Sequence, residues 1–136
     1  MGAPTVGGEG RDTELPLPEV VAGFTTGRGG ARLFHRWHPA ASPRAIVVVV
    51  HGLAEHSGRY LHLFENLNAA GISCQSIDLR GHGRSSGRRC YIDAWSDYLD
   101  DVDTAVSLAR EQAREKAGAE LPLFVFGHSM GGLVAA

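Results

Sequence analysis

The sequence predicts an α/β fold in which an N-terminal hairpin precedes parallel strands with flanking helices. Three observations predict it. The apolar run at residues 45–50 shows no polar alternation, which is typical of a strand buried on both faces of a parallel sheet. Residues 95–109 carry apolar side chains at helical spacing. Strand-like and helix-like segments alternate after residue 45, and that order favours right-handed βαβ units.

The N-terminal region divides into a leader and a hairpin. Residues 1–22 are rich in glycine, proline and charge, so we expect a disordered leader before a domain at 23–136. Residues 24–26 and 32–37 are expected to form two short strands. The glycine-rich link between them has the residues that a hairpin turn requires.

Further strands and a first helix are expected after the hairpin. A helix is predicted over residues 60–70, with Gly71 ending it and apolar positions at helical spacing: Leu61, Phe64 and Leu67. Strands are predicted at 72–77, which contains Cys74, and at 123–126 after the break at Pro122. No alternation marks this last strand as half exposed.

The second helix is marked by one apolar stripe: Trp95, Tyr98, Leu99, Val102, Ala105, Val106 and Ala109. Its first turns also carry four carboxylates: Asp97, Asp100, Asp101 and Asp103. Because no histidine or further acid shares their face, we interpret them as solvated charges that the helix dipole favours, and not as a metal or acid/base site.

Composition narrows the function. The chain has 136 residues, of which 43% are hydrophobic and 21% charged, with a net charge of −2 and a pI near 6.4. Neither value favours nucleic-acid binding. A local basic cluster is interpreted as a solvated loop, because no aromatic residues interleave it: Arg80, Arg84, Arg88 and Arg89. Cys74 and Cys90 form no metal or disulfide framework, the 81–87 loop lacks nucleotide-binding spacing, and we expect no cofactor and no metal.

Targeting signals are also lacking in the sequence. No stretch approaches the roughly 18 apolar residues that span a bilayer, and no signal peptide is evident. We therefore expect a cytoplasmic protein without a transmembrane segment. Peripheral membrane contact and the oligomeric state stay open.

The segment Gly127-His128-Ser129-Met130-Gly131 follows the last predicted strand and predicts a nucleophile elbow. Such a strand–turn–helix places a serine hydroxyl above the sheet edge, and glycines avoid collisions on either side. Ser129 is therefore the candidate nucleophile. The amide of Met130 would be one oxyanion donor.

A second loop is expected at the same sheet edge. His51-Gly52-Leu53 follows the buried strand 45–50, and Gly52 permits a sharp turn that leaves the amide of Leu53 to face a substrate oxygen. His51, Gly52, Gly127, His128 and Gly131 would support the two loops.

Three segments together resemble the α/β-hydrolase family, within it the monoacylglycerol lipase, lysophospholipase and serine aminopeptidase S33 group: residues 51–60, 78–87 and 127–132. The resemblance covers the N-terminal half of that fold and implies an acyl-enzyme on Ser129. It implies supporting positions for Glu55, Arg59 and the 78–87 loop. It also implies that the acid and the histidine follow the serine, in sequence that the chain does not contain.

No histidine in the chain is an obvious replacement base. His128 neighbours Ser129, but adjacent side chains on a tight turn diverge. His51 and His82 share the sheet edge and are assigned packing roles. The others show no ligand spacing: His35, His38, His56 and His62.

Two functions follow. In the first, the chain is part of a serine hydrolase of acylglycerol or lysophospholipid esters and ends just after the elbow. In the second, the 136-residue chain is an inert truncated isoform or fragment with at most an interaction role.

Overall fold

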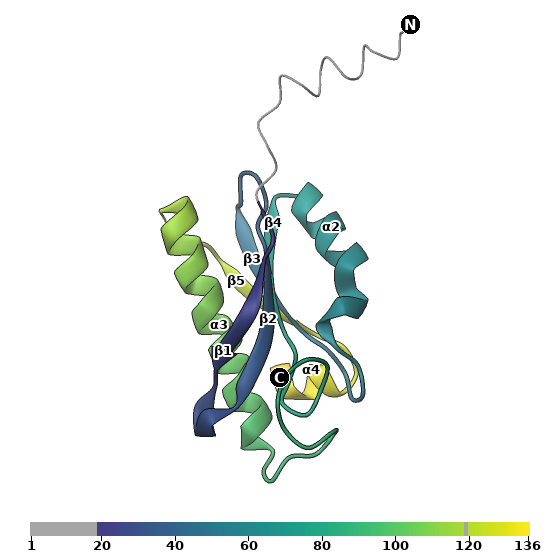
Figure 1. Ribbon diagram of the computed structural model, residues 1–136. Helices are drawn as coiled ribbons and strands as arrows, with labels where there is room; N and C mark the ends of the chain where they lie inside the picture. The colour runs from purple at the N-terminus through teal and green to yellow at the C-terminus, as the bar shows by residue number, and fades with distance from the viewer. Residues whose placement is uncertain (1–18, 119) are drawn as a thin grey trace, which may run out of the picture.

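The computed structural model describes residues 19–118 and 120–136. It shows one five-stranded sheet with the order β1-β2-β4-β3-β5 and helices on both faces (Figure 1). The strands are β1 (Val21–Thr26), β2 (Arg32–His38), β3 (Ala45–Val50), β4 (Ile72–Ile77) and β5 (Leu123–Gly127). The α-helices are α2 (Leu61–Ala69), α3 (Ser96–Ala117) and α4 (Met130–Ala135), and two short 3-10 helices are η1 (Arg28–Gly30) and η2 (Ser57–Tyr60). The predicted α/β architecture is confirmed.

The N-terminal hairpin pairs β1 with β2 in antiparallel register, from Val21 opposite Trp37 to Thr26 opposite Arg32. The ladder therefore starts two residues before the predicted domain boundary, because Val21 and Ala22 already pair with β2. The rest of the expected leader, residues 1–18, lies outside the described residues.

The centre of the sheet is parallel. β3 pairs with β4 on one side and with β5 on the other, and Val50 lies opposite Gly127. Because parallel strands end at the same edge, the segments that follow β3 and β5 begin side by side. The amide of His128 donates a hydrogen bond to the carbonyl of Val50 at 3.1 Å.

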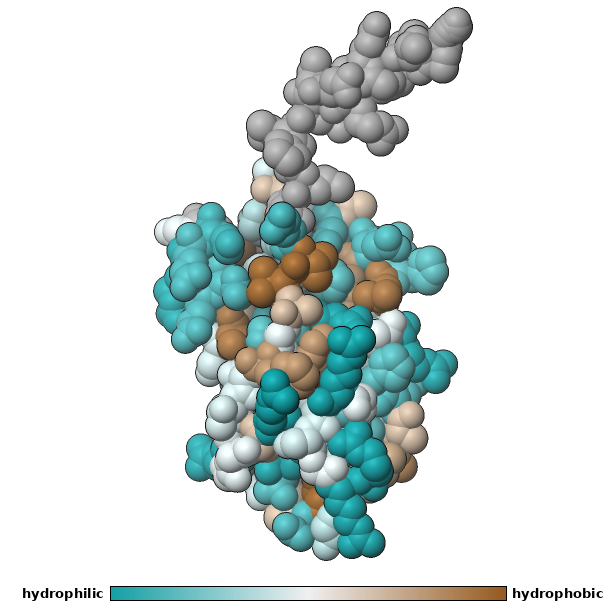
Figure 2. Space-filling model, in the orientation of Figure 1, coloured by the Kyte–Doolittle hydropathy of each residue, from teal (hydrophilic) through white to brown (hydrophobic). Residues whose placement is uncertain are grey.

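The larger core lies between the sheet and α3, which contributes Tyr98, Val102, Ala105, Ala109 and Ala113. On the opposite face, Phe64 of α2 packs with Val49 and Cys74. The predicted stripes were wrong at their flanks, since Leu61, Trp95 and Leu99 are 45%, 44% and 39% exposed. Trp95 precedes the first turn of α3, and the other two lie beside the buried stripe. Exposed apolar side chains form small groups on the face seen in Figure 2.

The last strand is more exposed than its sequence suggested. Phe124, Val125 and Phe126 are 60%, 37% and 44% exposed. Within the described residues β5 pairs only with β3 and forms an edge of the sheet. Composition alone does not state which strands lie beside β5.

Across the part of the chain that the structure describes, no helix is both long enough and apolar enough to cross a bilayer.

Candidate active site

Ser129 occupies a tight turn between β5 and α4. Its backbone angles are φ 56° and ψ −119°, outside the regions that residues other than glycine usually adopt. Such a conformation costs about 1–3 kcal/mol and persists only where the surrounding structure holds it. The side chain is exposed, so its hydroxyl is accessible.

Close backbone contacts hold this turn. A Cβ added to Gly131 would lie 2.5 Å from the carbonyl oxygen of His51 and nearer still to that of Val50. A Cβ added to Gly127 would lie 2.6 Å from the amide nitrogen of Gly132. Both positions require glycine because the obstructing atoms belong to the backbone. The strand–turn–helix context expected for residues 127–131 is present.

The His51-Gly52-Leu53 loop lies against the serine. An ideal Cβ on Gly52 would stand 3.3 Å from Ser129 Cβ and 3.1 Å from the carbonyl oxygen of His128. Leu53 is 55% exposed. Among the described residues, neither the Leu53 amide nor the Met130 amide donates a hydrogen bond. The geometry therefore leaves two backbone donors in the two loops that meet at Ser129.

The carboxylate of Glu55 holds the His51-Gly52-Leu53 loop in place. Glu55 Oε1 accepts hydrogen bonds from the Gly52 amide at 2.8 Å and from the Tyr60 hydroxyl at 2.7 Å. The Tyr60 hydrogen bond, followed by that from Gly52, lowers the pKa of Glu55 to about 2. Burial, followed by the same contact with Glu55, raises the pKa of Tyr60. An ionised Glu55 thus fixes Gly52, and sequence reasoning did not anticipate the contribution of Tyr60.

Neither histidine next to the serine turn is arranged as a base for it. Both ring nitrogens of His51 are occupied, since Nδ1 lies 2.7 Å from the carbonyl oxygen of Gly52 and Nε2 accepts from the Leu79 amide at 3.0 Å. Burial lowers the pKa of His51. His128 lies with Nδ1 3.5 Å from Glu55 Oε1. Its ring therefore faces Glu55, as expected for a side chain that diverges from its neighbour.

The remaining histidines serve other contacts. His82 is 2% exposed, its Nδ1 lies 3.1 Å from the carbonyl oxygen of Arg80, and its ring centre is 5.0 Å from that of His51. No hydrogen bond joins any of the seven histidine rings to Ser129 within residues 19–118 and 120–136. The other four lie on β2, before α2 or on α2: His35, His38, His56 and His62.

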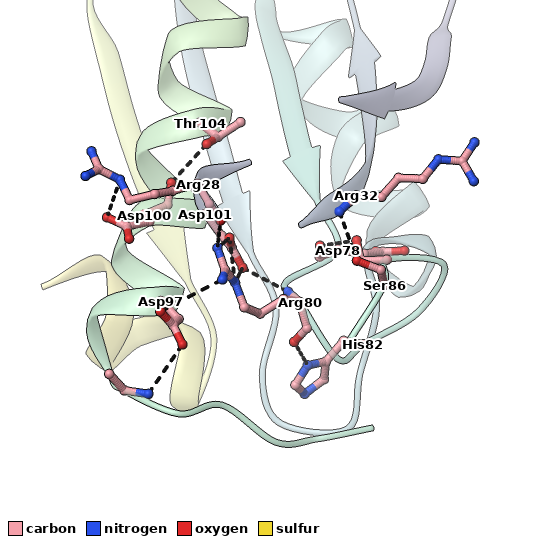
Figure 3. Close-up of polar contacts among 12 residues, drawn as sticks. Arg28, Arg32, Asp78, Arg80, His82, Ser86, Asp97, Asp100, Asp101 and Thr104 are labelled. Atoms are coloured by element: carbon pink, nitrogen blue, oxygen red, sulfur yellow. Dashed lines mark hydrogen bonds and ion pairs between the residues drawn. The ribbon is translucent and has the colours of Figure 1, made fainter. Parts of the chain in front are cut away.

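The glycine-rich loop after β4 is organised by Asp78. This carboxylate is 1% exposed and accepts from the amides of Ser57 at 2.7 Å and Arg84 at 3.0 Å. It therefore links the segment before α2 to the 81–87 loop. Figure 3 shows Asp78 together with Arg80, His82 and Ser86 of the loop that follows it.

Two charged residues were interpreted wrongly as solvated. Asp101 is fully buried and pairs with Arg80, whose Nη2 lies 2.7 Å from Asp101 Oδ1 (Figure 3). The Arg80 amide also donates to Asp101 Oδ2 at 2.9 Å. The pair ties the loop after β4 to α3. Spacing along one helix could not reveal it because the partner comes from another element.

Among the described residues, no group of three or more histidine, cysteine or acidic side chains is arranged to hold a metal ion. Cys74 is buried, and desolvation raises the pKa of its thiol to about 12.

A sheet of this order, with a strained serine between a parallel strand and a helix, defines an α/β-hydrolase fold. The family described as serine aminopeptidase, S33 matches residues 41–136, and the chain belongs to it. The resemblance read from the three sequence segments is confirmed.

Related proteins point the same way. Monoacylglycerol lipase of Mycolicibacterium smegmatis is 42% identical over 107 residues, covering 78% of this chain and 36% of the relative. Human monoglyceride lipase is 37% identical over 126 residues, covering 92% of this chain and 40% of the relative. The chain therefore spans roughly two fifths of the length of these relatives.

Solved structures support the fold. A thermostable carboxyl esterase from Bacillus coagulans in complex with glycerol superposes with a TM-score of 0.72 at 29% identity, over 87% of this chain and 39% of the esterase. A soluble variant of monoglyceride lipase from Saccharomyces cerevisiae, in complex with a substrate analog, gives a TM-score of 0.68 at 26% identity over 88% and 38% of the two chains.

Proposed function

We propose that this chain carries the nucleophile and oxyanion donors of a serine hydrolase of carboxylic esters, with acylglycerols or lysophospholipids as substrates. The observation that carries the proposal is the strained Ser129 turn packed against the Gly52 loop. The relatives named as monoacylglycerol and monoglyceride lipases support the substrate class.

In the proposed reaction, Ser129 Oγ attacks the ester carbonyl carbon, and its proton passes to a base. The carbonyl oxygen gains negative charge, which the amides of Leu53 and Met130 stabilise, each by about 2.7–4 kcal/mol. Collapse of this intermediate breaks the bond to the alcohol, which leaves with the proton. Water then attacks the acyl-enzyme, releases the carboxylic acid and restores Ser129.

The base is the missing element among the described residues. The rings of His51 and His128 are committed to Gly52, Leu79 and Glu55. An oxyanion hole without a base retains only a small part of the catalysis of a complete serine hydrolase. We therefore expect little or no turnover from the 136-residue chain alone, and a second candidate function is an inert chain with at most an interaction role.

The experiment compares two proteins. One consists of residues 1–136, and the other is encoded by the longest open reading frame that contains these residues. Hydrolysis of a monoacylglycerol and of a lysophospholipid is measured for each protein and for its Ser129→Ala variant. Ser107→Ala, on the exposed face of α3, is the matched control. The proposal expects Ser129→Ala alone to abolish hydrolysis in the longer protein. Equal rates with and without Ser129 would exclude the mechanism.

A further inference from the structure

The outer face of the hairpin carries arginines stacked on aromatic rings. Phe24 of β1 lies opposite Phe34 of β2, with ring centres 5.3 Å apart. Arg32 Cζ lies 3.8 Å from the centre of the Phe24 ring. Arg36 and Arg84 place their Cζ atoms 5.2 Å and 5.0 Å from the centre of the Phe34 ring. Three guanidinium groups therefore surround one aromatic pair.

The loop after β4 is fastened to β2, which explains how Arg84 reaches this face. The Phe34 amide donates to Ser85 Oγ at 2.9 Å, and the Arg32 amide donates to Ser86 Oγ at 2.9 Å. The Ser86 amide donates in return to the Arg32 carbonyl at 2.8 Å. The arginine surface, defined as Arg32, Arg36 and Arg84 with Phe24 and Phe34, thus spans the hairpin and the loop that is hydrogen-bonded to it.

The guanidinium groups of these arginines form no ion pair with any described residue. Within the described chain no carboxylate lies within 4.0 Å of the three guanidinium groups, and none of them donates a hydrogen bond. Asp78 contacts Arg84 only through its backbone amide. Arg80, by contrast, is neutralised by Asp101.

Arg84 is exposed, as the interpretation of a solvated loop expects, but its guanidinium also lies over an aromatic ring, which the sequence did not indicate. Its aromatic partner lies on β2, far away in the sequence. Arg32 extends outward, away from the Asp101 cluster, in Figure 3.

We propose that the arginine surface docks on membranes containing anionic phospholipids. A guanidinium stacked on a ring keeps its N–H edge available for a phosphate or carboxylate headgroup. Phe24 is 43% exposed, so the same surface offers an apolar side chain to the lipid interface. The net charge of the chain is −2, so attraction to lipid depends on this local surface and not on overall charge.

The register places the arginine surface near the sheet edge that carries Ser129. β2 runs antiparallel to β4, with His35 opposite Ile77, so Arg32 lies beyond the C-terminal end of β4. Arg84 lies in the loop that follows that end. Docking would bring this edge toward lipid, where acylglycerol esters reside. The proposal goes beyond the proposed function and does not depend on catalysis by Ser129.

The test measures flotation of the 136-residue protein with phosphatidylcholine vesicles, with or without phosphatidylserine. Each basic residue near an anionic surface contributes about fivefold to partitioning, so replacing all three arginines by glutamine should weaken it about 100-fold. Binding should also fall as salt shortens the Debye length from about 30 Å at 0.01 M to about 8 Å at 0.15 M. Replacing the three arginines by lysine should largely preserve binding and controls for folding.

A matched control removes the same charge elsewhere, by changing the exposed α3 residues Arg110, Arg114 and Lys116 to glutamine. Retained binding in this control and loss in the surface variant supports the proposal. Equal loss in both, or no preference for phosphatidylserine, overturns it. Equally strong binding to free inorganic phosphate or to polyglutamate overturns it too, by indicating a small-anion or protein site. Ser129→Ala should bind vesicles normally, which separates this test from that of the enzyme.

Discussion

The packing of the serine turn against the end of β3 makes Gly131→Ala the most informative substitution. The added methyl group would lie 2.5 Å from the carbonyl oxygen of His51 and closer to that of Val50. Both are backbone atoms, so neither can rotate away. Gly132→Ala is a matched control one residue further along α4, because its methyl group would meet its nearest neighbour, the Gly127 carbonyl oxygen, at 3.4 Å.

The difference in the free energy of unfolding between these two variants measures the cost of the steric overlap at Gly131. Both replacements gain similar helix propensity, about 1 kcal/mol, which cancels in the comparison. Overpacking a well-packed site costs about 1–3 kcal/mol. Because the obstructing atoms belong to the backbone, we expect the upper end of that range, so that Gly131→Ala is about 3 kcal/mol less stable than Gly132→Ala.

Urea unfolding of both variants, with the free energy extrapolated to water, gives this difference directly. Amide chemical shifts of His51 and Gly52 should move in Gly131→Ala and stay in place in Gly132→Ala. Equal free energies of unfolding would refute the close approach of α4 to the end of β3, and with it the placement of Ser129 beside the Gly52 loop.

Three other predictions concern charge and burial. Asp101→Asn should destabilise by about 1.5–3 kcal/mol in urea unfolding, because it removes the charge of a fully buried carboxylate that accepts hydrogen bonds from Arg80. Asp103→Asn, at an exposed position, should change stability by less than about 0.5 kcal/mol. Cys90 is exposed and should react with iodoacetamide at pH 8. Cys74 is buried and its thiol has a pKa of about 12, so it should be modified only when the protein unfolds. Peptide mass spectrometry distinguishes the two modified cysteines. The pKa of Glu55 is about 2 in the folded protein, compared with an ordinary value of 4.5. The ionised carboxylate therefore stabilises the fold fully above about pH 4.5, and this contribution is lost as the pH falls toward 2. Glu55→Gln should make unfolding less dependent on pH in that range, and an acid-unfolding curve equal to that of the unchanged protein would contradict the assignment.

The order of strands and helices could be predicted because local patterns specify it. The run at 45–50 marked the central strand, Gly71 marked the end of α2, and the 27–30 link marked the hairpin. Exposure was less predictable. Phe124 and Phe126 have the composition of buried residues, yet both are exposed in the described residues, where β5 pairs with β3 alone, and composition does not specify a strand's neighbours.

In the candidate site, too, local backbone features could be predicted and contacts between distant side chains could not. The turn at Ser129 was predictable because only glycine tolerates the close backbone contacts on either side of it. The sequence has glycine at both positions, Gly127 and Gly131. The link from Glu55 to Tyr60 and the Arg80–Asp101 pair were not predicted. Each depends on side-chain direction or on elements that meet only in the folded chain.

Above all, we propose that Ser129 is the nucleophile and that its turn positions the hydroxyl for attack. The most direct measurement is covalent labelling, with a fluorophosphonate, of the protein encoded by the longest open reading frame that contains residues 1–136. In this reaction the serine oxygen replaces fluoride on phosphorus. Peptide mass spectrometry then locates the adduct. The account predicts one adduct on the peptide containing Ser129, absent from Ser129→Ala. Labelling that persists in Ser129→Ala, or that falls on another serine, would contradict it.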